Sequence, residues 1–450
     1  MTLLLSFTAL LPRIFLGFFI VHSIWNARDG KSLLVKIFLS AGAGFGISSL
    51  LGFLWIWAGL PLTVYAWVES IVAIILMVWL LVQNRRLLRM PQISVKQELL
   101  WSSILAAGVL FFLLNLMLYG LQYPHGRPDA WINWNVVARF IHLGGADWQA
   151  TFLRQFDHPD YPLYLPMTNA ITWTLIREPS TWGAIAFHFV NTFFTAGLLF
   201  SFINRFRDFK QAALATVIFI SLPFTIGQGM RQYADMLLAQ LILAAGGLTL
   251  LYLQTKENRL AILTGLVIGL AGWAKNEGLI AILVLTLLWV VLTVKKEKQA
   301  LWKYFAGLAF PLLVVILFKL FLAPSNDLLA GQGNLLEKVL EVERYRIIAK
   351  HAFTTLWGLG DAPVSLFGII ILTAIILGRS NRGIPGLWFI PALIGILLTA
   401  YFGTYLLTPQ DLSWHLNTSL DRLYLHLFPL ALLWFLLWLK SPQELLSKES

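Results

Sequence analysis

One carboxylate stands beside two tryptophans in the longest polar stretch of the chain. Asp129 follows Pro128 at the start of a helix-like segment, and Trp131 and Trp134 come in the next turn. A carboxylate there can deprotonate an acceptor hydroxyl, while aromatic rings can stack on sugar faces. The alternative is a helix N-cap that accepts hydrogen bonds from free backbone amides. We predict a catalytic role for Asp129 and substrate contacts for Trp131 and Asn135.

A rigid segment between prolines lies later in the same stretch. Residues 157–164 combine two acids, a histidine and two tyrosines, and three of them are predicted to bind substrate: His158, Asp160 and Tyr161. The alternative is that prolines and aspartates here only make turns. Their oxygens would also suit a divalent cation. Because no Asp-x-Asp pair occurs in the chain, a site without a metal or other cofactor is favoured.

Two short turns place several ionisable groups between long apolar stretches. Each turn contributes three predicted substrate-binding residues: Arg231, Tyr233 and Asp235 in the first, and Lys275, Asn276 and Glu277 in the second. Ionisable groups in such positions are functional candidates by default. The alternative is a topological role for the cations, but that would place Arg231 and Lys275 on the cytoplasmic side.

The last polar segment, 408–421, precedes an apolar stretch that begins at Arg422. A guanidinium at that point is a suitable fork for a phosphate, and His415 is a second donor. The alternative is a capped helix start at Ser419 with a neighbouring Asp421–Arg422 pair. Arg13 and Lys319 lie inside other apolar stretches, where an unpaired charge is costly, and their partners are not evident from the sequence.

The elements that must position these residues are membrane helices. The chain is 58% hydrophobic and 12% charged, more apolar than a soluble core can accommodate. Its continuous apolar runs exclude the alternating strands of a membrane barrel. The sequence therefore predicts an all-α polytopic membrane protein with thirteen spans, at about 3–25, 33–53, 61–82, 99–121, 182–203, 211–227, 233–253, 259–275, 277–294, 303–323, 361–378, 386–407 and 422–439.

Basic residues predict the orientation. They gather in alternate loops: Arg28 and Lys31; Arg85, Arg86, Arg89 and Lys96; Arg205, Arg207 and Lys210; Lys256 and Arg259; Lys295, Lys296, Lys298 and Lys303; Arg379 and Arg382; Lys440 and Lys448. Such loops face the cytoplasm, so we expect the N-terminus outside and the C-terminus inside. The net charge of +11 is then a topology signal and does not indicate a nucleic-acid partner.

The predicted organisation is a three-helix segment, 1–98, followed by a catalytic membrane region, 99–450. Two large outer loops, 122–181 and 324–360, contain short amphipathic helices. One of these, at about 334–355, carries an apolar stripe between charged residues and is expected to lie on the membrane surface. The absence of cysteine excludes disulfides and thiolate chemistry.

From about residue 99 onward, the chain resembles bacterial GT-C membrane glycosyltransferases of the family 39 type. The resemblance rests on five segments in order, all on the predicted outer face: 129–135, 158–162, 233–236, 275–278 and 414–423. It departs from the family pattern in two respects. Three helices precede the large loop, which usually follows the first span, and the acid pair typical of some members is reduced to Asp129.

The resemblance implies an inverting glycosyltransferase in the bacterial inner membrane that moves a sugar from a polyprenyl-phosphate donor to a glycan, lipid or protein acceptor outside the cytoplasm. Asp129 would then be the general base or orient the acceptor. From electrostatics we add that four cationic groups are candidates for holding the lipid phosphate: Lys275, Arg231, His415 and Arg422.

Two other readings remain open at this stage. A transporter or flippase for a lipid-linked or sugar substrate would be expected to show paired half-domains and helices broken at mid-bilayer. The sequence shows neither feature. A non-catalytic lipid-binding scaffold is also compatible, although the ionisable residues Asp129, Lys275 and Arg422 favour an enzyme.

Overall fold

In the computed structural model, the described residues are 1–84, 98–153, 158–295, 297–326, 335–359 and 365–446. Every element within these ranges is a helix, apart from an isolated bridge between Arg379 and Leu439. The predicted all-α membrane architecture is therefore confirmed. The predicted basic loop at 85–97, Asp157, Lys296 and parts of the loop at 324–360 lie outside the described residues.

Ten described helices are long and apolar enough to cross a membrane. They are α1 (Thr2–Ile24), α2 (Gly30–Trp57), α3 (Leu62–Gln83), α4 (Leu99–Gln122), α7 (Thr181–Phe206), α10 (Asp235–Thr255), α12 (Asn276–Thr293), α13 (Lys298–Phe321), α18 (Phe389–Leu407) and α19 (Leu412–Trp438). The count is eleven if the bent pair α8 (Phe209–Ser221) and α9 (Pro223–Met230) forms one span. The chain is embedded in a membrane, but thirteen full spans are not confirmed.

The shortfall has a physical basis in the lengths of two helices. α11 (Asn258–Ala274) has 17 residues and α17 (Leu366–Leu377) has 12, and both are strongly apolar. At 1.5 Å per residue they extend about 25 and about 18 Å, whereas a bilayer core is about 30 Å thick. Apolar sequence therefore correctly indicated helices at both places but overestimated how far they reach.

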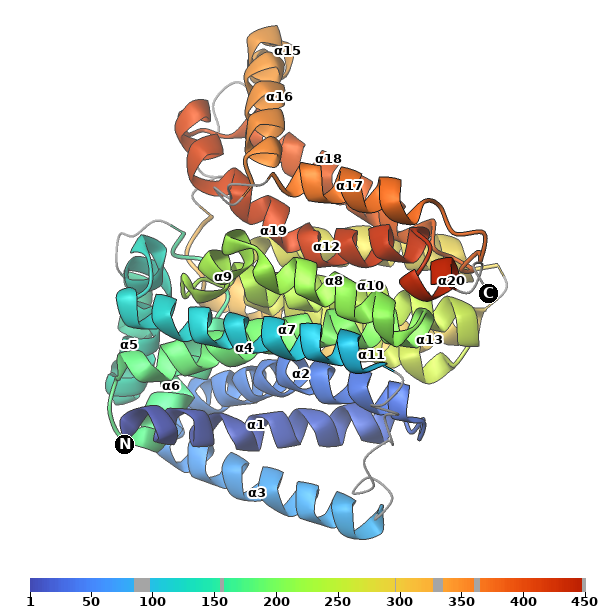
Figure 1. Cartoon of the computed structure of the whole chain (residues 1–450). Coiled ribbons are helices and arrows are strands. Elements are labelled where there is room, and N and C mark those ends of the chain that lie inside the picture. Colours follow the sequence, from blue (N-terminus) through green and yellow to red (C-terminus); the bar gives the residue numbers. More distant parts are fainter. Residues whose placement is uncertain (85–97, 154–157, 296, 327–334, 360–364, 447–450) are drawn as a thin grey trace.

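Figure 1 shows most of the long helices lying side by side, with α5 (Asn135–Leu143), α6 (Tyr164–Ile176) and the N-terminus at one end of the bundle and α20 (Pro442–Leu446) at the other. The short helices η3 (Ala130–Trp134) and η4 (Gly145–Leu153) also belong to the loop between α4 and α7. That loop corresponds to the first predicted outer loop.

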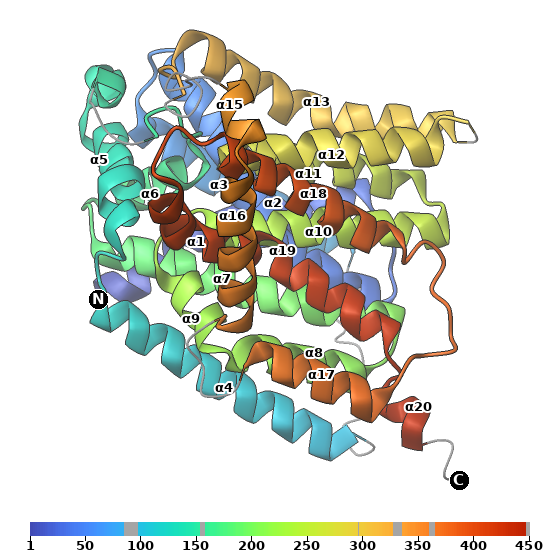
Figure 2. The same cartoon turned by 90° about the horizontal axis from the view of Figure 1, so that it is seen from above.

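The predicted surface helix at 334–355 is two helices, α15 (Leu335–Leu340) and α16 (Val342–Trp357), separated at Glu341. α16 packs on α18 and α19 and crosses the long helices rather than running along them (Figure 2). Of its side chains only Ile348 is buried, while Val342 and Phe353 are exposed. This arrangement suits a helix in contact with the membrane surface.

The first three helices are packed into the same bundle as the rest. α2 contacts α6, α7 and α11. Arg13, in α1, has the partners that the sequence did not reveal. Its guanidinium donates to the Thr168 carbonyl at 2.9 Å, the Thr172 hydroxyl at 3.0 Å and the Ala9 carbonyl at 2.8 Å. The buried charge thus ties α1 to α6.

Two glycines allow a close crossing of α11 and α13. A Cβ added to Gly265 would lie 2.0 Å from the Tyr304 carbonyl oxygen, and one added to Gly307 would lie 2.0 Å from that of Ile262. Small residues let membrane helices approach at this distance. Because α11 ends beside Lys275 and Lys319 lies near the end of α13, the crossing fixes where both cations lie.

Gly307→Ala is expected to lower the free energy of unfolding by about 1–3 kcal/mol, because the new methyl group meets backbone that cannot yield easily. Gly395→Ala in α18 is the matched control, since a Cβ there has open space around it. It should leave stability unchanged or raise it slightly. Unfolding of the purified proteins in detergent measures both effects, and equal stability of the two variants would contradict the close crossing.

Candidate functional site

Six ionisable side chains from four parts of the chain meet at one end of the bundle. We call this group the charge cluster: Asp129, Asp235, Lys275, Glu277, Arg422 and His426. Asp129 comes from the loop after α4, Asp235 begins α10, Lys275 lies between α11 and α12, and Arg422 and His426 lie on α19. The three carboxylates face two cations and one histidine, so the formal charge nearly balances.

Asp235 is the centre of the charge cluster. Its side chain has no exposed surface, and one carboxylate oxygen receives the Lys275 ammonium at 2.9 Å and His426 Nε2 at 2.9 Å. The other oxygen receives Arg422 Nε at 3.1 Å. A buried carboxylate needs such partners to remain charged. Lys275 also contacts Glu277 at 2.6 Å.

Arg422 bridges two carboxylates of different exposure. Its Nη1 donates to Asp129 at 2.7 Å while its Nε donates to Asp235. The guanidinium also lies over the Tyr233 ring, 4.8 Å from the centroid, in a cation–π contact. Its Nη2 is buried and has no hydrogen-bond partner among the described residues. One donor of the guanidinium therefore lacks an acceptor in this arrangement.

Asp129 is the accessible carboxylate of the bridged pair, with 29% of its side chain exposed. It precedes η3 but makes no side-chain capping hydrogen bond, so the N-cap interpretation is wrong. Its backbone N–H donates to the Tyr233 hydroxyl at 3.2 Å. Burial, and then the Asp129 charge, raise the pKa of Tyr233 to about 12, so this phenol stays protonated at neutral pH.

The backbone around Asp129 is fastened to the turn that precedes α10. Gly126 has a φ of +73°, and a Cβ there would lie 2.6 Å from the Arg231 carbonyl oxygen. That oxygen accepts a hydrogen bond from the Arg127 N–H at 3.1 Å. Glycine is needed because the left-handed conformation and the close approach both exclude a side chain. The turn at Arg231 therefore anchors the loop through its backbone, while its predicted contact with substrate stays a prediction.

Asn135 does not belong to the charge cluster. It strengthens the attachment of the loop to the turn before α10. Its amide nitrogen donates to the Gln232 oxygen at 2.8 Å, and its own oxygen accepts from Asn169 at 2.9 Å. Gln232 in turn donates to the Pro124 carbonyl at 3.0 Å. These bonds hold the start of α5 against the turn before α10.

Asp160 and Asn276 belong to a second polar group beside the charge cluster. One Asp160 oxygen accepts from Lys319 at 2.7 Å, from Asn276 at 3.0 Å and from Asn326 at 3.0 Å. Lys319 also donates to the Asn276 side-chain oxygen at 2.7 Å. Lys319 thus has its partner, and the proline-rich segment is attached to the ends of α12 and α13.

Three aromatic rings are stacked between the two polar groups. Tyr161 lies between Trp134, with ring centroids 4.9 Å apart, and His158, at 4.8 Å. The Lys275 ammonium is 5.9 Å from the Tyr161 centroid. Burial raises the pKa of Tyr161 well above its usual value, and nearby Glu277 raises it further.

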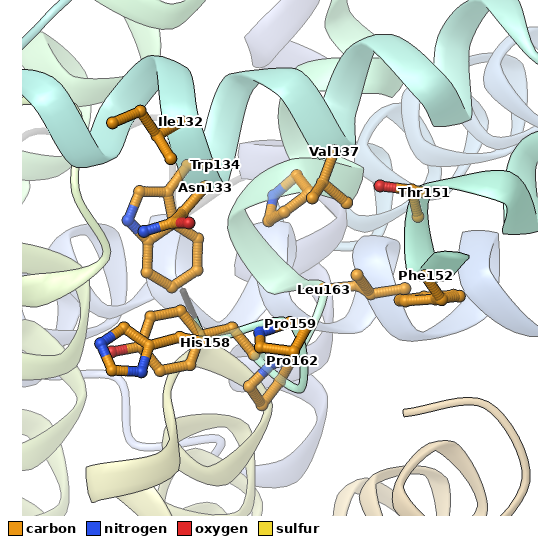
Figure 3. Close-up of a pocket in the computed structure, with 12 residues that line it drawn as sticks. Ile132, Asn133, Trp134, Val137, Thr151, Phe152, His158, Pro159, Pro162 and Leu163 are labelled. Carbon is orange, nitrogen blue, oxygen red and sulfur yellow. The ribbon is translucent and has the colours of Figure 1, made fainter. Parts of the chain in front are cut away.

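Trp134 is the tryptophan that packs inward, being only 1% exposed, whereas Trp131 is 54% exposed. The predicted flanking of Asp129 by both indoles is therefore not seen. Figure 3 shows the cavity beside Trp134, His158, Pro159 and Pro162. Its volume of about 30 Å³ would hold about two water molecules, too little for a sugar ring.

Two further predicted residues, His415 and Arg231, do not belong to the charge cluster. His415 Nδ1 lies 2.8 Å from the Thr408 hydroxyl, and its ring packs edge-on to Tyr405. Arg231 pairs with Asp421 at 3.0 Å. The expected helix start at Ser419 is wrong, because α19 begins at Leu412, where Asp411 caps it. Arg422 therefore lies inside the helix rather than at its start.

His426 is the member of the charge cluster that sequence reasoning missed. A usable signal was present, since residues 422 and 426 lie four apart and share one face of a helix. Gln228, which donates to Asp421 at 2.7 Å, was also missed.

Among the described residues, no group of three or more histidine, aspartate or glutamate side chains is arranged to hold a metal ion. No family model, curated protein or solved structure matches this chain.

Asp235→Asn is expected to lower the free energy of unfolding by about 3–5 kcal/mol, because Lys275 and Arg422 would keep their buried charges without the central anion. Asp421→Asn is the control, since that carboxylate pairs with an arginine but is 30% exposed. We expect about 0–1 kcal/mol for it. Similar losses for both variants in denaturation experiments would contradict a central role for Asp235.

Proposed function

We propose that the protein is an inverting, metal-independent glycosyltransferase that uses a polyprenyl-phosphate sugar. The observation that carries this proposal is the placement of Asp129, a partly exposed carboxylate joined through Arg422 to a buried ionic network. A general base must be accessible to its substrate and fixed in direction. Asp129 meets both conditions, whereas Asp235 is fully enclosed.

The proposed reaction is a single displacement at the anomeric carbon. The acceptor hydroxyl oxygen attacks this carbon as its proton passes to Asp129. The bond from the anomeric carbon to the phosphate oxygen breaks, and its electron pair leaves with the polyprenyl phosphate. Attack opposite the leaving group inverts the configuration. Positive charge near the departing phosphate lowers the barrier.

Arg422 would contact both the general base Asp129 and the leaving phosphate. In the absence of the lipid donor, Arg422 is paired with Asp129, and its buried Nη2 lacks an acceptor. A movement of the side chain would let Nη2 donate to a phosphate oxygen. A phosphate that takes over the guanidinium would release Asp129 toward the acceptor. Lys275 lies in the same charge cluster, while Arg231 and His415 are further candidate phosphate contacts from neighbouring positions.

The surroundings are compatible with a lipid-linked donor. α15 and α16 expose Leu336, Leu340 and Phe353 beside the end of the bundle that holds the charge cluster. We assign this end to the extracytoplasmic side of a bacterial inner membrane, because Arg207, Arg379 and Arg382 lie at the other end. The N-terminus is then outside and the C-terminus inside.

Asp129→Asn is expected to reduce sugar transfer by about 100-fold or more, because the amide cannot accept the proton. The assay incubates purified protein with radiolabelled polyprenyl-phosphate sugars and a natural lipid extract as acceptor. Asp411→Asn should retain activity, since asparagine also caps a helix. Full activity of a folded Asp129→Asn protein would exclude the base role, and loss of transfer in EDTA would exclude a metal-independent reaction.

Arg422→Lys is expected to raise the KM for the donor about tenfold while kcat changes less, because an ammonium cannot grip a phosphate and a carboxylate as a fork does. Steady-state kinetics with varied donor concentration separates the two parameters. An unchanged KM with a reduced kcat would show that Arg422 only orients Asp129.

A further inference from the structure

A second polar site lies at the opposite end of the bundle from the charge cluster. A cavity of about 670 Å³ is formed where α7, α10 and α20 meet the loop before α18, with Arg207, Asp208, Gln254, Arg382, Ile384 and Glu444 among its lining residues. This volume is within the range of small-molecule sites. Neither the proposed reaction nor the predicted site residues involve it.

Arg207 is the buried cation of this cavity. Its side chain is 6% exposed, and its Nη2 donates to the Arg382 carbonyl at 3.0 Å and the Leu437 carbonyl at 2.6 Å. Its Nε is buried without a hydrogen-bond partner among the described residues. A guanidinium in this state is under-coordinated, since all its N–H groups seek acceptors when removed from water.

Glu444 supplies the anion that now faces this cation. One of its oxygens lies 3.5 Å from Arg207 Nη1 and 3.7 Å from Arg382 Nε, while the other accepts from the Ser380 hydroxyl at 3.1 Å. Both arginine distances exceed those of a charge-assisted hydrogen bond, which are about 2.7–2.9 Å. These two distances are therefore those of ion pairs that leave room for a closer anion at Arg207 and Arg382.

We propose that this cavity binds a phosphate group, which displaces Glu444 and is held by Arg207 and Arg382. Phosphate presents more acceptor oxygens than a carboxylate and matches the guanidinium fork. Asp208 opposes the anion only in part, because one of its oxygens caps α8 through the Gln211 N–H. With Glu444 moved aside, two arginines face one aspartate.

The phosphate can belong to a lipid headgroup or to a soluble compound, and the two sources are distinguishable. Phe206 and Ile384 give the cavity an apolar part, which suits the first methylene groups of a lipid's acyl chains. Basic loop residues at this end of the bundle would also attract anionic lipids. A soluble phosphate would need neither feature.

The test uses the full-length protein in detergent. Native mass spectrometry in micelles containing equal phosphatidylglycerol and phosphatidylcholine reports lipid retention, and thermal unfolding with inorganic phosphate, against chloride at equal ionic strength, reports soluble binding. Arg382→Gln should weaken binding about tenfold or more, the loss expected for a charged hydrogen bond. Its side chain is 75% exposed, so folding should be retained.

Glu444→Gln is the second variant and should strengthen binding, because it removes the competing anion. Arg346→Gln is the control, since that arginine pairs with Glu343 at 3.4 Å on exposed α16, and it should bind as the parent does. Selective phosphatidylglycerol retention supports a lipid headgroup, and stabilisation by phosphate alone supports a soluble ligand. If neither is observed, or if Glu444→Gln weakens binding, the proposal is overturned.

Discussion

The structure depends on how the negative charge of Asp235 is accommodated inside an apolar bundle. A buried carboxylate is tolerated only when charged partners surround it, and here they come from the α11–α12 turn and α19. One ion therefore fixes the relative positions of α10, the α11–α12 turn and α19. Arg422 extends this constraint to the loop after α4 by taking Asp129 as its second carboxylate. The partly exposed Asp129 is therefore positioned, through Arg422, by the buried Asp235.

Glycine contacts elsewhere in the bundle serve the same arrangement. α11, which ends next to Lys275, packs on α10, which begins at Asp235, and it crosses α13 closely at Gly265 and Gly307, where there is no room for side chains. The same α13 carries Lys319, which attaches the segment of Asp160 and Tyr161 to the end of the bundle. Helix packing in the apolar region and ion pairing at the end of the bundle therefore act together to position these residues.

The features that were predicted correctly from the sequence are those that depend on short-range patterns. Apolar runs marked the helices, and the turns at Arg231 and Lys275 were correctly placed because polar groups rarely interrupt such runs. The sequence could not predict which charged residues form ion pairs, since Arg422 and Asp129, for example, are 293 positions apart. Local patterns also misplaced the start of α19 and could not tell that Trp134 turns inward while Trp131 faces out. Which ring is buried depends on Tyr161, which only the tertiary fold brings near.

The short length of α11 has a consequence for selectivity. This helix reaches about 5 Å less than the bilayer core, and Lys275, which follows its last residue, is only 2% exposed. Bulk water, which competes with any acceptor as a nucleophile, is excluded from such an enclosed position. For a transferase of the proposed kind, this enclosure would favour transfer over hydrolysis, so an activated sugar would be conserved until an acceptor hydroxyl arrives.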